Sequence, residues 1–154
     1  MKHLEAAEQT AYVAWCRTTP ATRLVFAIPN GGKRSILEAV RLRKEGVLPG
    51  VPDLMLPVAC GQAHGLFVEM KSLVGVLSAD QREMLELLAA SGYAVAACWG
   101  AVQAIALTEQ YLRGELLPGV YLRKPLASVK TRSPRRCLAR QKTTINPQSL
   151  PAPV

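Results

Sequence analysis

A glutamate and a lysine stand two residues apart at the end of the apolar stretch GLFVEMKS, residues 65–72. The stretch predicts a β-strand, and residues two apart along a strand point to the same face of a sheet. Glu69 and Lys71 therefore share one face, while Val68 and Met70 occupy the other. A carboxylate in this position can bind a divalent metal ion, and a lysine beside the ion can polarise a water molecule or stabilise charge on a phosphate. A lone E-x-K pair is more often part of a solvated surface, so the chemistry needs a second carboxylate.

Asp53 supplies that second carboxylate if residues 53–59 and 65–71 form a hairpin around the loop CGQAHG. Pairing centred on Gly61 places Asp53 opposite Glu69, and directly opposed side chains have Cβ atoms about 4.5–5.5 Å apart. Pairing centred on the middle of the loop shifts the register by about two positions, which leaves the carboxylates within diagonal reach. Two carboxylates at this spacing repel each other unless a positive charge lies between them. Because Mg²⁺ prefers oxygen ligands, the pattern predicts a metal-dependent site for phosphodiester chemistry.

The helices and strands that must position these residues follow from hydrophobic spacing and turn signals. They occur in the order α-β-α-β-β-α-β-α, which predicts an α/β fold with a mixed central sheet flanked by helices. The predicted helices cover residues 3–18, 34–46, 78–91 and 101–114, and the predicted strands cover residues 23–28, 53–59, 65–71 and 93–99.

Composition favours one globular domain in a reducing compartment. The 154 residues are 49% apolar, which suffices for a hydrophobic core. No apolar run is long enough to span a membrane, and the first residues, MKHLEAAEQT, lack the apolar core of a secretory signal. The four cysteines are scattered without C-x-x-C spacing, so we expect neither a disulfide framework nor a zinc site. A cytoplasmic location without a membrane partner is the simplest expectation.

The net charge of +8 is confined to one end of the chain. Residues 1–122 carry equal numbers of acidic and basic side chains, and we expect them to form the domain. Residues 123–154 carry all the excess positive charge, contain no acid and are rich in proline, so we expect a disordered tail. Such a tail either binds a polyanion such as DNA or is a solvated extension without a partner.

The residues around the acids resemble a known family. GVPDLML, followed by GLFVEMKSLVGVLSADQREMLELLAASGYAVAACWG, is similar to the VRR-NUC (virus-type replication-repair nuclease) domain of the PD-(D/E)xK superfamily, in its stand-alone phage or bacterial type. The similarity runs from about Glu5 to about Leu112, and IPNGGKRS matches the family's usual lead into its second helix. The resemblance implies a restriction-endonuclease-like core and a homodimer. It also implies a Mg²⁺- or Mn²⁺-dependent nuclease that acts on branched or flap DNA in replication, repair or recombination.

The same resemblance implies roles for individual residues. By position, Asp53 and Glu69 correspond to metal ligands, and Lys71 corresponds to the catalytic lysine. The family's first helix carries a glutamate that precedes a glutamine by four residues, as Glu5 precedes Gln9 here. Glu5 would then reach a metal ion directly or through a water molecule.

Two positions keep alternative roles open. Glu8 lies one helical turn from Glu5 and could replace it as the acid of the first helix. Gln81 matches the family's glutamine, which lines the site from the helix after the ExK strand. It also fits a capping box, in which Ser78 is the N-cap and Gln81 its partner three residues later. Gln81 could also alternate between these two roles, lining the site at one time and capping the helix at another.

A basic segment, residues 17–44, precedes Asp53 and Glu69 in the chain. It either contacts the phosphates along DNA or forms an ordinary solvated helix face.

Two other classes of function compete with the nuclease. One is a non-catalytic nucleic-acid-binding protein that acts through its tail, and the other is a dimeric structural subunit of a replication or repair complex. The intact Asp53, Glu69 and Lys71 favour the nuclease. The candidate nucleic-acid contacts are Asn30, Lys33, Arg34, Arg41 and Lys44.

Overall fold

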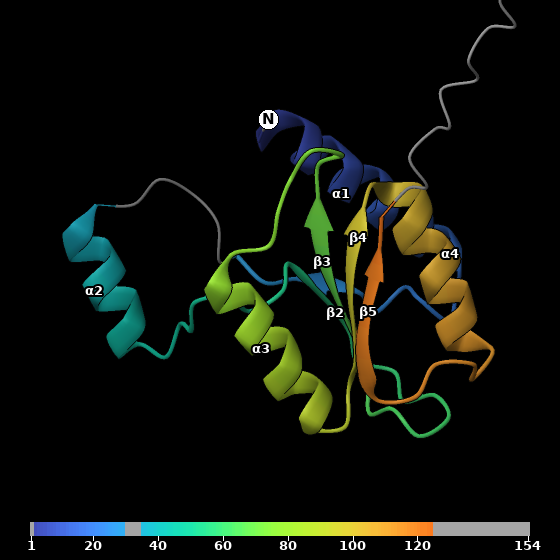
Figure 1. The fold of residues 1–154 in the computed structure, drawn as a ribbon. Coiled ribbons are helices and arrows are strands. Elements are labelled where there is room, and N and C mark those ends of the chain that lie inside the picture. The colour runs from blue at the N-terminus through green and yellow to red at the C-terminus, as the bar shows by residue number, and fades with distance from the viewer. Residues whose placement is uncertain (1, 30–34, 125–154) are drawn as a thin grey trace, which may run out of the picture.

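The computed structural model describes residues 2–29 and 35–124, which contain a five-stranded sheet and four helices (Figure 1). The predicted α/β class, with a mixed sheet flanked by helices, is confirmed. The helices are α1 (Lys2–Thr18), α2 (Ile36–Lys44), α3 (Ala79–Ala90) and α4 (Ala101–Leu112). The strands are β1 (Phe26–Ala27), β2 (Leu54–Leu56), β3 (Leu66–Lys71), β4 (Ala94–Trp99) and β5 (Gly119–Arg123).

The strands of the sheet follow chain order, β1-β2-β3-β4-β5. β1, β2 and β3 are antiparallel neighbours, whereas β3, β4 and β5 run parallel. Leu54 pairs with Val68, which is the register centred on Gly61. Because β3, β4 and β5 are parallel, their last residues meet at one edge of the sheet, where Lys71 pairs with Trp99. We call this the carboxyl edge.

The structure adds a fifth strand, β5, after the predicted elements. Its residues alternate between half-buried and exposed, and they pair with β4 in parallel. Such a pairing depends on the helix that crosses from one strand to the next, so a short local pattern does not reveal it. The first strand is also shorter than the predicted residues 23–28, because only Phe26 and Ala27 pair with β2.

Two hydrophobic clusters fill the two sides of the sheet. On one side, α1 and α4 contribute Tyr12 and Tyr111 to a cluster that contains Val68 and Met70 of β3. On the other side, α3 packs against β4 through Leu85. Figure 1 shows α3 and α4 on opposite sides of the central strands. Strand alternation therefore turns the charged residues of β3 away from the first cluster, as predicted.

The helix α2 differs from the others because none of its residues is buried and it packs against no other described helix or strand. Figure 1 shows it to one side of the sheet. Its first turn is held locally, since the Glu38 N–H donates to Ser35 Oγ at 3.2 Å. Ile36 and Leu37 are 85% and 83% exposed, so no hydrophobic face of the described domain holds this helix.

The described chain continues just past the expected domain boundary at residue 122. β5 ends at Arg123, and Lys124 Nζ lies 4.8 Å from the centroid of the Trp99 ring. The rest of the expected tail, residues 125–154, lies outside the described residues. Within the part of the chain that the structure describes, no helix is long and apolar enough to cross a membrane.

Candidate active site

Asp53 is held immediately before β2 and next to β3. Its backbone carbonyl accepts a hydrogen bond from Ile28 N at 2.7 Å. Its side-chain Oδ2 accepts one from Met70 N at 2.8 Å. Because the hairpin register is centred on Gly61, the Asp53 carboxylate lies beside Glu69. This is the arrangement from which the sequence analysis predicted a metal ion shared by the two residues.

Glu69 is buried, with only 2% of its surface exposed. Its Oε1 accepts hydrogen bonds from Lys71 Nζ, at 2.5 Å, and from Gln81 Nε2. Its Oε2 is also buried but has no hydrogen-bond partner among the described residues. A buried carboxylate oxygen without a partner is costly, and a bound ion is one arrangement that would satisfy it.

Glu5 completes a group of three carboxylates. One oxygen each from Glu5, Asp53 and Glu69 lie within 4.8 Å of one another. Glu5 Oε1 also lies 3.7 Å from Lys71 Nζ. Oxygens that each lie about 2.0–2.6 Å from one cation can be this far apart, so the donor set fits a hard divalent ion. The unpartnered Glu69 oxygen is a second feature that fits such an ion. We call Glu5, Asp53 and Glu69 the carboxylate group.

Glu8, the alternative acid of the first helix, has a different partner. Its Oε2 accepts a hydrogen bond from the backbone N–H of Ala101, the first residue of α4, at 2.6 Å. α4 begins after Gly100, which offers no side chain to cap the helix. The Glu8 carboxylate therefore satisfies a free N–H and complements the positive end of the helix dipole. The two candidates for the acid of the first helix therefore have different surroundings. Glu5 lies in the carboxylate group, whereas Glu8 lies at the start of α4.

The pKa values reflect the crowding of these acids. Burial raises the pKa of Glu69 to about 7, and the negative charge of Asp53 adds to the rise. The hydrogen bond and positive charge of Lys71 act in the opposite direction. Burial also raises the pKa of Asp53, against the hydrogen bond from the Met70 N–H. A cation beside both acids would favour their charged forms and reverse these shifts.

Gln81 occupies both of its candidate roles at once. Gln81 N donates to Ser78 Oγ at 3.2 Å, and Ser78 N donates to Gln81 Oε1 at 3.0 Å, which completes a capping box. The Nε2 of the same side chain donates to Glu69. One amide can do both because it has an acceptor oxygen and a donor NH₂ group. The helix cap thereby sets the direction from which Gln81 reaches Glu69.

Two of the candidate nucleic-acid contacts can be placed, and both lie on α2. Arg41 Nη1 is 3.6 Å from Glu45 Oε1 within the same stretch of chain, and Lys44 is the last residue of the helix. Neither is brought to the carboxylate group, since α2 packs against no other described element. Their contact with DNA stays a prediction. Outside the described residues lie Asn30, Lys33 and Arg34.

Trp99 and Lys124 lie at the same edge of the sheet, and neither was among the residues predicted for the site. Trp99 is the register partner of Lys71, and its Nε1 donates to Gly75 O at 2.7 Å. Lys124 Nζ lies over the Trp99 ring. The positions depend on the parallel register of β3, β4 and β5, which no local pattern encodes.

Comparison with known proteins agrees with this geometry. Residues 2–102 match the VRR-NUC domain family, and this range contains the whole carboxylate group together with Lys71 and Gln81. The chain is also similar to a solved structure of a VRR_NUC domain protein. Their sequence identity is 27% and the TM-score is 0.63, over 77% of this chain and 92% of that one. No curated protein matches the chain. The chain therefore belongs to the VRR-NUC family of nuclease domains, built on a restriction-endonuclease-like core.

Proposed function

We propose that this protein is a metal-dependent DNA endonuclease that hydrolyses phosphodiester bonds. The observation that carries the proposal is the unpartnered, buried oxygen of Glu69, set among three carboxylates and beside the buried Lys71. A structural ion pair would need only Glu69 and Lys71. The two further acids, Glu5 and Asp53, would destabilise such a pair, because their negative charges repel that of Glu69. Hydrolysis of a phosphodiester, in contrast, needs a cation at the phosphate and a polar group beside the attacking water.

Each residue then has a distinct task. Glu5, Asp53 and Glu69 would hold Mg²⁺ or Mn²⁺, which when bound supplies charge neutralisation at the phosphate and a more acidic water. Lys71 lies close enough to these acids to donate a hydrogen bond to the attacking water or to a phosphate oxygen. Gln81 orients the Glu69 carboxylate, and the β3 backbone orients Asp53.

We further propose branched or flap DNA in replication, repair or recombination as the substrate. Membership of the VRR-NUC family supports a nucleic-acid substrate. Lys124 adds positive charge at the carboxyl edge, which is also the edge where Lys71 lies. Basic side chains bind phosphates without reading the sequence of bases, so the structure of the DNA is the expected source of selectivity.

A cleavage assay on single-stranded, duplex, flap and four-way DNA tests this function. We expect cleavage in Mg²⁺ or Mn²⁺, fastest on a branched substrate, and none in EDTA. Lys71→Ala should slow cleavage by about 10²-fold or more, because it removes the group beside the reacting water. Arg113→Ala is the matched control, since Arg113 is an exposed residue whose partner is Glu115. Cleavage that persists in EDTA, or at the wild-type rate in Lys71→Ala, would refute the mechanism.

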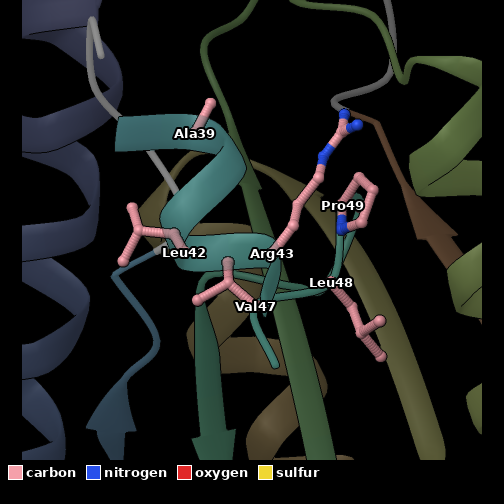
Figure 2. A pocket seen from close by; sticks show the side chains of 7 residues that line it. Ala39, Leu42, Arg43, Val47, Leu48 and Pro49 are labelled. Atoms are coloured by element: carbon pink, nitrogen blue, oxygen red, sulfur yellow. The ribbon is translucent and has the colours of Figure 1, made fainter. Parts of the chain in front are cut away.

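We also propose that the protein forms a homodimer through α2 and the segment that follows it. Ile36 and Leu37 expose most of their surface, and Leu48 is more than half exposed. Leu48 also lines a hollow formed by α2 and the segment after it, and Figure 2 shows the side chains that line this hollow. A second copy of the chain would cover this apolar surface, which no other described element covers. The hollow is lined by Ala39, Leu42, Arg43, Val47, Leu48, Pro49 and Gly50.

The oligomeric state can be measured by light scattering coupled to size-exclusion chromatography. We expect the wild-type protein to be a dimer and Leu37→Glu to be a monomer, because it is unfavourable to bury a charge among the apolar side chains of an interface. Leu117→Glu is the control, since Leu117 is also exposed but lies before β5, far along the chain from α2. A monomeric wild-type protein, or a dimeric Leu37→Glu variant, would contradict this interface.

A further inference from the structure

The turn that follows Lys71 presents apolar side chains to solvent. Leu73, Val74 and Val76 are 70%, 73% and 74% exposed. Single exposed apolar residues are common on protein surfaces, but three within four positions form a local apolar tip. The tip begins only two residues after the candidate catalytic lysine.

The base of this turn is held firmly. Gly75 N donates to Ser72 O at 2.8 Å, which closes a four-residue turn with Leu73 and Val74 at its centre. The indole N–H of Trp99 donates to Gly75 O at 2.7 Å, and Trp99 is itself buried. Ser72, at the start of the turn, and Leu77, shortly after its end, are buried as well. The two flanks are therefore anchored in the domain while the apolar side chains between them point outward.

The turn also packs closely against Lys71. A Cβ added at Gly75 would lie 3.3 Å from Lys71 Cδ and 3.2 Å from Ser72 O, so a larger residue there would shift these groups by a few tenths of an ångström. Trp99, which holds the turn, carries Lys124 Nζ over its ring. The apolar tip thus follows directly after one cation, Lys71, and its base is anchored to the tryptophan that carries a second, Lys124. Cations and apolar side chains in one region suit a ligand with alternating phosphates and flat apolar bases.

We propose that Leu73 and Val74 contact unstacked bases next to the phosphate that lies at Lys71, and so favour DNA that is unpaired at this point. The inference rests on the proposed nuclease function and names the feature of the substrate that the site selects. Apolar side chains of this kind insert between base steps in other DNA-binding proteins, and the cost of unstacking is lowest where bases are already unpaired. The tip is too small for a protein interface, which typically covers about 800 Å² on each partner.

A fluorescent base reports this contact directly. 2-Aminopurine is quenched by stacking, so it is placed at the branch point of a flap substrate and at the same position of a continuous duplex. Binding is measured with Ca²⁺ in place of Mg²⁺. We expect the wild-type protein to raise the fluorescence of the flap substrate and to bind it more tightly than the duplex. The double variant Leu73→Ser, Val74→Ser should lose the rise and reduce the preference for the flap by about tenfold.

Leu117→Ser is the matched control, because it changes one exposed leucine to serine at the other end of the domain, before β5 begins. It should keep both the fluorescence rise and the preference. Thermal melting of all proteins checks that the exposed substitutions leave the fold intact. No fluorescence rise with wild-type protein, or an unchanged rise with the double variant, would overturn the inference. The binding measurement is independent of cleavage, so a protein that unstacks the base but never cleaves DNA would refute the nuclease and leave this contact standing.

Discussion

The side chain of Gln81 joins the first turn of α3 to the buried carboxylate of Glu69. Its Oε1 accepts a hydrogen bond from Ser78 N at 3.0 Å, and its Nε2 donates to Glu69 Oε1. One residue thus completes a helix cap and orients a candidate metal ligand. Its contributions to stability and to activity can be separated, because Ser78 takes part only in the cap.

Comparing Gln81→Ala with Ser78→Ala separates the two contributions. Each variant loses half of the capping box, so each should lower the free energy of unfolding by about 1 kcal/mol. Only Gln81→Ala also removes the hydrogen bond to Glu69, so it alone should slow cleavage, by about tenfold. The measurements are denaturant unfolding and cleavage of a flap substrate in Mg²⁺. Equal losses of activity would mean that Gln81 acts only through the stability of α3.

The raised pKa of Glu69 makes the metal-free protein sensitive to pH. Its value is about 7 in the folded protein against 4.5 for an ordinary glutamate, so the folded state binds the proton more tightly. The corresponding stability is complete below about 4.5 and is lost as the pH rises through about 7. In EDTA we therefore expect the melting temperature to fall between pH 5 and pH 8, by several degrees.

Glu69→Gln is the control for this pH dependence. The amide is uncharged across the range, so most of the fall in melting temperature should disappear, and Asp53, whose pKa is raised in the same direction, would account for the remainder. Adding Mg²⁺ to the wild-type protein should raise the melting temperature more at pH 8 than at pH 5, because the ion binds the charged carboxylates. A Mg²⁺ effect that does not change with pH would count against the carboxylate group as its site.

Glu5 and Glu8 should respond differently to substitution. Glu5→Gln removes one charged oxygen donor from the carboxylate group and should weaken Mg²⁺ binding and cleavage by about tenfold or more. Glu8→Gln weakens a charge-assisted hydrogen bond to the first N–H of α4 and should lower stability by about 1 kcal/mol with cleavage retained. Calorimetric titration with Mg²⁺, thermal melting and the flap assay distinguish the two. The reverse pattern would show that Glu8 is the acid that serves the site.

The basic tail, residues 123–154, carries all of the excess positive charge of the chain, so we expect it to strengthen DNA binding. Because Lys124 contacts Trp99, the truncation that tests it ends at Lys124. We expect residues 1–124 to fold and to cleave DNA but to bind it more weakly. The slope of log affinity against log salt should flatten by about 0.7–0.9 for each phosphate contact that is lost. An unchanged slope would mean that residues 125–154 are a passive extension, and an unfolded truncation would mean that they belong to the domain.

The sequence by itself placed Asp53 within reach of Glu69, and the structure chose the register centred on Gly61 from the two that the loop allowed. A hairpin is a local structure, so a short loop limits its register to a few choices, and strand alternation assigns Glu69 and Lys71 to one face in each of them. Residues 78–91 were likewise readable as a capped helix, because the Ser78 cap depends on positions only three residues apart. These features need no knowledge of distant parts of the chain.

Only the tertiary structure decided the choice between Glu5 and Glu8. The two residues lie on successive turns of α1, and it is the packing of α1 beside the start of α4 that gives Glu8 a partner at Ala101. The parallel register that brings Lys71 beside Trp99 was equally beyond local reasoning. Parallel strands are joined through long crossovers, so their alignment, and with it the turn that Trp99 anchors beside Lys71, is set by packing between segments that are distant in the chain.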